Sequence, residues 1–180
     1  MWIFFPDSGT DTRIVSARMD EGLHTPRLDL VLLSPADARA LLDGANRDRR
    51  EGSNGYPLGS TLLRAELTAA AAAQQRPLGR FGTYQVVRRA DAQVIGDVGF
   101  VGPPDETGAV TVGCTITDDA RGQGYATEAL TALLAWAREQ PGLTCVLADT
   151  TRSNLASQRL LERVGMHRIG QDGELLYYML

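Results

Sequence analysis

Hydrophobic and polar positions along the chain follow the period of a strand in some stretches and the period of a helix in others. Short apolar or alternating runs predict strands at residues 27–33, 83–89, 93–102, 108–119, 143–150, 166–171 and 175–180. Helical periodicity predicts helices at residues 34–44, 60–73 and 153–165, and a further helix after Gly124 that ends near residue 139. The order is β-α-α-β-β-β-α-β-α-β-β with neither an internal repeat nor a linker, which predicts a single α/β domain.

Two of these helices carry clear local signals. Ser34 is placed to cap the first helix, Pro35 occupies its first turn, and Gly44 stops it. In the second helix, Leu63, Leu67 and Ala70 stand at i, i+4 and i+7 and form one apolar face. Apolar residues at similar spacing give the helix after Gly124 a face made of Ala126, Leu130, Leu133, Leu134 and Ala137.

Composition narrows the classes of protein that fit this pattern. The chain has 180 residues, 43% hydrophobic and 22% charged, as expected for one soluble globular domain. Its net charge of −4 gives no indication of nucleic-acid binding. Every basic residue among the 18 is Arg, so a phosphate-binding loop that ends in Gly-Lys and a lysine Schiff base are both excluded.

Cysteine, histidine and hydropathy set further expectations. Cys114 and Cys145 stand in apolar runs and are expected to be buried, reduced thiols. His24 and His167 are far apart without a partner at ligand spacing, so we expect no metal. The chain has no apolar segment near the ~20 residues that span a bilayer, and "MWIFF" lacks the positive flank of a signal peptide. We therefore expect a cytoplasmic protein without a membrane partner.

The stretch "RGQGYA", residues 121–126 and here named the glycine loop, stands where a predicted helix begins. A helix N-terminus has about four unpaired N–H groups and a partial positive charge, and glycines let an anion approach them. Two glycines alone favour an ordinary turn between a strand and a helix. A dinucleotide site needs a third glycine, and Thr127 stands at that position.

Two motifs resemble a known family. "RGQGYA" fits the Q/R-x-x-G-x-G/A signature of GNAT N-acetyltransferases, and "NLASQRLLERVGM" is similar to their N-x-x-S-x-x-L-L-E-x-x-G-F segment, with Met166 in place of Phe. The resemblance covers residues 25–180 and is strongest in the branch of the Rim-type ribosomal-protein N-terminal acetyltransferases. Residues 1–24 remain an N-terminal arm of unknown role.

The resemblance implies a fold and a donor site. The fold is α/β (α+β), a single-domain GNAT-like arrangement whose central sheet is mixed, mostly antiparallel and twisted, splayed between two parallel strands and flanked by helices. Acetyl-CoA would be the co-substrate, with its pantetheine arm between the splayed strands. The residues implied in acetyl-CoA binding are Cys114, Thr115, Ile116, Arg121, Gly122, Gln123, Gly124, Tyr125, Ala126, Asn154 and Ser157. Asn154 is also a natural helix cap, and both roles are compatible.

Catalytic residues are less clearly indicated. Relatives often carry a general-acid Tyr where this chain has Leu161, which leaves Ser157 as the candidate acid, although a serine there can also bond its own helix backbone. Many relatives have Glu where Thr111 stands, so Asp97 or Glu106 would have to act as base through a water, unless solvent takes the proton. Cys114 is expected to be a core residue, because the family uses direct attack without an acyl-enzyme.

The acceptor is an amine, either on a small molecule or at a protein N-terminus. Arg47, Arg49 and Arg50 lie in a loop that commonly walls the acceptor site, and Tyr56 and Tyr84 either line a pocket or pack. The alternative function is a non-catalytic acyl-CoA-binding or regulatory module on the same fold. A homodimer is left open.

Overall fold

The structure is a computed structural model that describes residues 22–44 and 55–180. Within these residues the strands are β1 (Leu23–His24), β2 (Leu28–Leu32), β3 (Thr83–Arg88), β4 (Gln93–Phe100), β5 (Ala109–Ile116), β6 (Cys145–Thr151), β7 (His167–Asp172) and β8 (Leu175–Met179). The helices are α2 (Pro35–Leu42), α3 (Gly59–Ala73), α4 (Tyr125–Arg138) and α5 (Leu155–Arg163), with short 3-10 turns η2 (Gly79–Phe81) and η3 (Asp118–Ala120). The residues 45–54 that separate the first two helices, and with them Arg47, Arg49 and Arg50, lie outside the described part.

The strands form one sheet in the order β1-β2-β3-β4-β5-β6-β8-β7. All neighbouring pairs are antiparallel except β5 and β6, which are parallel. This parallel pair is short, since Ala109–Thr111 face Cys145–Leu147 and neither strand continues the ladder with the other. Beyond Thr111 the two strands part, which confirms the mixed, splayed sheet expected from the sequence.

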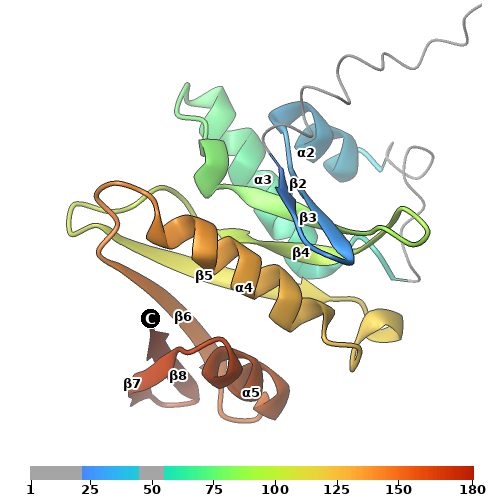
Figure 1. Cartoon of the computed structure of the whole chain (residues 1–180). Helices are drawn as coiled ribbons and strands as arrows, with labels where there is room; N and C mark the ends of the chain where they lie inside the picture. Colours follow the sequence, from blue (N-terminus) through green and yellow to red (C-terminus); the bar gives the residue numbers. More distant parts are fainter. Residues whose placement is uncertain (1–21, 45–54) are drawn as a thin grey trace, which may run out of the picture.

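Helices cover the two faces of the first half of the sheet (Figure 1), where α4 crosses in front of β5 and α2 and α3 lie behind. The α4 side holds the main hydrophobic core, because Leu130, Leu133 and Leu134 of α4 are buried against strand residues such as Val98 and Val112. A second, smaller cluster joins α2 and α3 and consists of Leu33, Ala38, Leu41 and Ala65. Burial of the α4 face agrees with its predicted apolar stripe, although Ala126 is only half-buried.

Helix α3 differs from its sequence pattern. Its apolar residues Leu63 and Leu67 are 59% and 41% exposed, whereas Thr61, Ala65 and Thr68 face the protein. Thr61 meets the carboxylate of Asp97 on β4, Ala65 packs in the cluster with α2, and Thr68 donates to Arg64 O of its own helix. The leucine stripe therefore predicted the helix correctly but is not the face that packs on the sheet.

Candidate active site

The glycine loop joins the end of β5, through η3, to the first turn of α4. Gly122 and Gly124 have φ angles of +75° and +83°, in the left-handed region that favours glycine. Gly124 is the N-cap of α4 and offers no side chain to cap it, and the first bond of the helix runs from Glu128 N–H to Gly124 O. The N–H groups in the first turn of α4 therefore have no side-chain acceptor at the N-cap, as a site for an anion requires.

Arg121 and Gln123 brace this loop. Arg121 donates through Nε to Ile116 O at 3.0 Å and pairs with Asp118 Oδ1 at 2.6 Å, so it ties the loop to the last residue of β5. Gln123 Nε2 donates to Asp119 O at 3.3 Å. The side chains that the sequence predicted to contact a donor thus also fix the conformation of the loop.

A residue that the sequence interpretation did not single out, Arg27, holds the loop from the other side. Its Nη1 donates to Gln123 O at 3.0 Å, its Nε pairs with Glu128 Oε2 at 2.6 Å, and its guanidinium lies 4.6 Å from the centre of the Tyr125 ring. Thr25 also donates to Glu128, at 2.6 Å. Burial raises the pKa of Glu128, but these hydrogen bonds outweigh it and hold the pKa below its ordinary value.

The stretch Cys114 to Ile116 lies in the part of β5 that has left β6. It still pairs with β4, with Cys114 opposite Val98 and Ile116 opposite Gly96. Cys114 and Cys145 are free thiols, as expected, but both residues are only partly buried. Desolvation of the Cys114 sulfur, reinforced by the negative charge of Asp97, raises the pKa of its thiol to about 12. Because the thiolate is the nucleophilic form of cysteine, this thiol is unsuited to attack at neutral pH, in agreement with the expectation of direct transfer.

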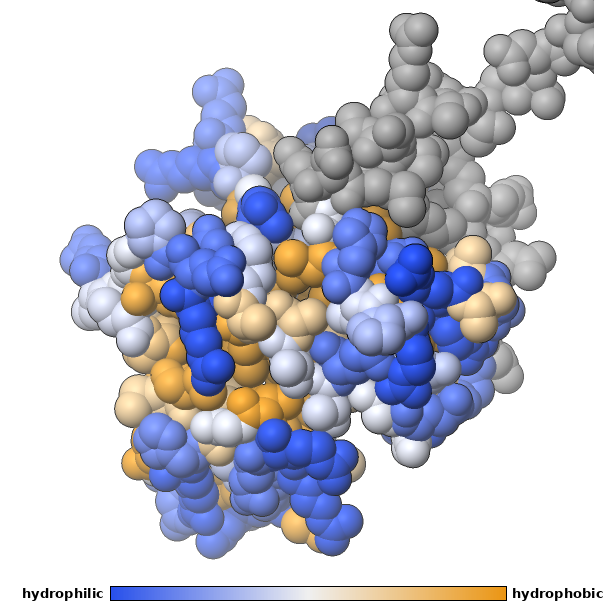
Figure 2. Space-filling view, viewed as in Figure 1, coloured by the Kyte–Doolittle hydropathy of each residue, from blue (hydrophilic) through white to orange (hydrophobic). Residues whose placement is uncertain are grey.

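Asn154 and Ser157 begin α5, directly after β6. Asn154 Oδ1 accepts a hydrogen bond from the Ser157 N–H at 3.1 Å, so the predicted N-cap is confirmed. The Ser157 hydroxyl is half-buried and bonds to no residue that the structure describes, including its own helix backbone. Figure 2 shows the surface indented between the part that carries α5 and the part that carries the N-terminal end of α4.

Asp97 lies on β4 under α3 and is completely buried rather than solvated. Thr61 donates to its Oδ2 at 2.5 Å, and Arg64 Nε lies 3.2 Å from its Oδ1 in a geometry too bent for a hydrogen bond. These three residues are here named the Asp97 cluster. Burial raises the pKa of Asp97, against the Thr61 hydrogen bond and the charge of Arg64, which lower it.

Three further candidates from the sequence, Glu106, Tyr84 and Tyr56, belong neither to the glycine loop nor to the Asp97 cluster. Glu106 is exposed in the turn between β4 and β5. Tyr84 is fully buried and donates to Arg80 O at 2.9 Å, so it packs in the core. Tyr56 is half-buried, and its hydroxyl accepts from Gln85 Nε2 at 3.0 Å.

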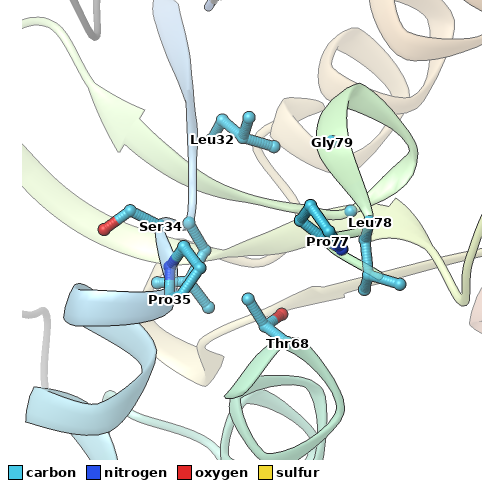
Figure 3. A pocket seen from close by; sticks show the side chains of 9 residues that line it. Leu32, Ser34, Pro35, Thr68, Pro77, Leu78 and Gly79 are labelled. Carbon is cyan, nitrogen blue, oxygen red and sulfur yellow. The ribbon is translucent and has the colours of Figure 1, made fainter. Parts of the chain in front are cut away.

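A pocket of about 170 Å³ opens on the α2 and α3 side of the sheet (Figure 3), and no residue of the glycine loop lines it. It is lined by Leu32, Leu33, Ser34, Pro35, Thr68, Pro77, Leu78, Gly79 and Gly82. The lining is mainly apolar and holds neither an ionisable side chain nor any residue that the sequence predicted for the site. It is therefore not part of the candidate active site.

The described residues hold neither a metal-binding group nor a membrane-spanning helix. In ranges 22–44 and 55–180, no three histidine, cysteine or acidic side chains gather in a way that could hold a metal ion. None of the helices in those ranges combines the length and the apolar character needed to cross a bilayer.

Comparison with known proteins identifies the class. Residues 27–167 match the family described as acetyltransferase (GNAT) domain, so the chain belongs to the GNAT family, a class of acetyl-CoA-dependent acyltransferases. It is similar to the uncharacterized N-acetyltransferase YjdG of Bacillus subtilis strain 168, at 32% identity over 85 residues. That similarity covers 47% of this chain and 51% of the relative, so the chain spans about half the length of the curated relative it matches.

Solved structures with the same fold cover far more of the chain. An acetyltransferase from Agrobacterium tumefaciens strain C58 is 27% identical with a TM-score of 0.61, over 88% of this chain and 93% of that chain. RimL, a ribosomal L7/L12 alpha-N-protein acetyltransferase solved in complex with coenzyme A, has a TM-score of 0.64 at 15% identity, over 88% and 97% of the two chains. The second likeness concerns the fold, and it agrees with the Rim-type resemblance of the sequence.

Proposed function

We propose that this protein is an N-acetyltransferase that moves the acetyl group of acetyl-CoA to a primary amine, which attacks the thioester directly. One observation carries the proposal: β5 and β6 part beyond Thr111, and the parted end of β5 leads into the uncapped N-terminus of α4. An extended chain can enter between the strands while its phosphates meet the helix end. Family membership and the coenzyme A complex of RimL support this donor.

The residues of the glycine loop fit a pyrophosphate. Among the described residues, no atom lies within 4 Å of the position that a Cβ would take on Gly122, so the backbone there is open on that side. The positive charge of Arg121 is shared with Asp118, an exposed partner that a phosphate could replace, and the nearby carboxylate of Glu128 is paired with Arg27. When bound, acetyl-CoA supplies an acetyl group activated as a thioester.

Around the thioester, the protein would act mainly through backbone and hydroxyl groups. An N–H in the stretch Cys114 to Ile116 would donate to the carbonyl oxygen as negative charge develops there. Ser157, whose hydroxyl has no partner among the described residues, would donate a proton or a hydrogen bond to the departing sulfur. Asn154 would hold the first turn of α5, and so Ser157, in place.

The proton balance needs no buried base. The amine nitrogen forms the new C–N bond, the C–S bond breaks, and the proton lost by the amine is equivalent to the one that the thiolate takes up. Asp97 as the base stays a prediction, and its complete burial and its contacts with Thr61 and Arg64 favour instead a role in positioning α3. Water at the acceptor is then the simplest proton carrier.

Thiol release from acetyl-CoA, measured across a panel of amines, tests the proposal. Release that depends on the amine, with formation of the N-acetyl product by mass spectrometry, is expected. Binding of coenzyme A by calorimetry without turnover of any amine would instead establish the alternative, a non-catalytic acyl-CoA-binding module. Binding of NAD but not of coenzyme A would overturn both.

A further inference from the structure

Arg64 extends from α3 onto the parted section of β5. Its Nη2 lies so close to Gly113 that a Cβ at this position would overlap it. The missing side chain at Gly113 therefore lets the guanidinium lie against the strand backbone. Gly113 is one residue from the stretch Cys114 to Ile116 and belongs to the section of β5 that no longer pairs with β6.

The guanidinium has donors to spare. Only Nε is near a carboxylate, 3.2 Å from Asp97 Oδ1, and neither Nη group makes a hydrogen bond to any described residue. The side chain is only 14% exposed. Among the described residues, Asp97 Oδ1 is the one fully buried side-chain nitrogen or oxygen without a hydrogen bond. The Nη atoms of Arg64 also lack a hydrogen bond, so they are not fully buried and must reach solvent. Arg64 thus presents two free donors from a sheltered position.

The surroundings hold this arginine in place. Asp97 fixes the inner end of the guanidinium and is itself held by Thr61, while the Arg64 carbonyl accepts from Thr68 Oγ1 at 2.9 Å. Beside it, Ser60 donates to Thr115 Oγ1 at 3.2 Å, which adds hydroxyl groups next to the strand. A fixed fork of N–H donors with partial shielding from water is the arrangement that binds a carboxylate in two places.

We infer that Arg64 binds the carboxylate of the acceptor, so that the acceptors are amines with a carboxylate one or two carbons from the nitrogen, such as free amino acids. The inference rests on the proposed function, since it names the substrate class of that same site. A strand advances about 3.3 Å per residue, so a carboxylate at Gly113 leaves its nearby amine level with Cys114 or Thr115. There the nitrogen gains the acetyl group and loses a proton, the C–S bond breaks, and the carboxylate is unchanged.

The experiment compares amines that differ only in the carboxylate. Initial rates of thiol release are measured for amino acids and for the corresponding amino-acid amides, which keep the amine and lack the negative charge. For the natural protein we expect kcat/KM to favour the acids by about 10- to 100-fold, the size that charge-assisted hydrogen bonds give. A peptide with a free N-terminus has an amide at that position and should behave like the amino-acid amides.

Three variants separate recognition from folding. Arg64→Lys keeps the charge but loses the fork, and should lower the acid preference most of the way to unity. The double variant R64Q/D97N removes both charges, avoids an unpaired buried carboxylate, and should also abolish the preference while calorimetric binding of coenzyme A is retained. Arg76→Gln, at an exposed arginine just beyond α3, is the matched control and should keep the preference.

The outcomes are distinct. Turnover of acids and amides at equal rates, or an equal loss for both in Arg64→Lys, would overturn the inference and leave the proposed acetyl transfer intact. Turnover of other primary amines but of neither series would also overturn the inference, whereas coenzyme A binding without turnover of any amine would overturn the proposed function itself. An acid preference that disappears in both Arg64 variants and survives in Arg76→Gln would establish Arg64 as the residue that selects the acceptor.

Discussion

The proposed donor side and the proposed acceptor side of this molecule are built in different ways. On the proposed donor side, residues 121–126 form a continuous loop that would act through backbone amides, with Gly122 and Gly124 in left-handed conformations. On the acceptor side, the Asp97 cluster brings side chains together from α3 and β4, against Gly113 on β5. One site is local in sequence and made of main chain, whereas the other is long-range and made of side chains.

The same contrast appears in the carboxylates. Glu128 stands at the edge of the donor side, and hydrogen bonds hold its pKa below the ordinary value despite the opposing effect of burial. Asp97 lies inside the acceptor side, where burial raises its pKa despite Thr61 and Arg64. A charge near the surface is satisfied by its partners, and a charge in the interior is not fully compensated by them.

The largest effect is expected from blocking the glycine loop. Gly122→Val places a branched side chain over the amides at a left-handed position, and we expect coenzyme A to bind about 100-fold more weakly by calorimetry. The left-handed conformation should also cost about 1–2 kcal/mol of unfolding free energy. Turnover should fall with donor affinity, but the ratio of rates between acceptors should not change.

Gly173→Val provides the matched control for that variant. Gly173 has a φ of +54° in the turn between β7 and β8, and a Cβ there would also meet nothing within 4 Å. It should therefore lose a similar amount of stability in urea unfolding while coenzyme A affinity stays as in the natural protein. Equal losses of affinity in the two variants would show that strain, rather than access to the amides, governs donor binding.

A smaller effect is expected from Arg27, which contacts the proposed donor side from a distant part of the sequence. Arg27→Gln releases Gln123 O and leaves the Glu128 carboxylate without its cationic partner beside the proposed phosphate site, so the apparent KM for acetyl-CoA should rise about tenfold with little change in kcat. The double variant R27Q/E128Q removes that carboxylate and should recover part of the loss. No recovery would mean that Arg27 acts only by bracing the loop.

On the acceptor side, Gly113→Ala should have a more selective effect. The added methyl group takes the place of the Arg64 guanidinium, whose flexible end can move aside, so the fold should persist. The preference for acids over amides should fall several-fold, up to about tenfold, with coenzyme A affinity unchanged. Gly170→Ala on β7, where a Cβ meets nothing within 4 Å, should alter neither quantity.

The difference between the two sides also explains what the sequence could predict. The order of strands and helices and the Asn154 cap followed from local patterns, because period and caps are properties of contiguous residues. The splayed sheet and the interpretation of the glycine loop followed from the resemblance to GNAT motifs, which are also made of contiguous residues. Arg27 and the Asp97 cluster depend on contacts between segments far apart in the chain, and a single sequence does not place Arg64 over Gly113.

Helix α3 shows how this limit misleads. Its leucine spacing indicated one apolar face, but Leu63 and Leu67 are exposed, and Thr61 and Arg64 are used inside instead. A threonine and an arginine in a helix read as surface residues until the buried Asp97 opposite them is known. The signal that could have found the cluster was Asp97 itself, a charged residue in the middle of an otherwise apolar strand.

The smallest expected effect is in how stability depends on pH, and it tests the contrast between the two carboxylates directly. The folded-state pKa of Glu128 is below its ordinary value of 4.5, so its contribution is present above that value and is lost as the pH falls through the lowered pKa. Asp97 has a folded-state pKa above its ordinary value of 3.8, so the folded state keeps its proton longer than the unfolded state. Its contribution is therefore complete below 3.8 and is lost as the pH rises toward the raised pKa.

Urea unfolding at a series of values from about pH 3 to pH 7 resolves these opposite slopes. Glu128→Gln should remove a loss of stability on acidification, whereas Asp97→Asn should remove a loss on raising the pH. Above the raised pKa of Asp97, Asp97→Asn also leaves Arg64 without its counter-charge and changes the absolute stability, so the slope and not the absolute value is the measure. If both substitutions change the slope in the same direction, the two carboxylates are in similar environments, and the contrast between a carboxylate stabilised by its partners and one whose charged form is disfavoured by burial is lost.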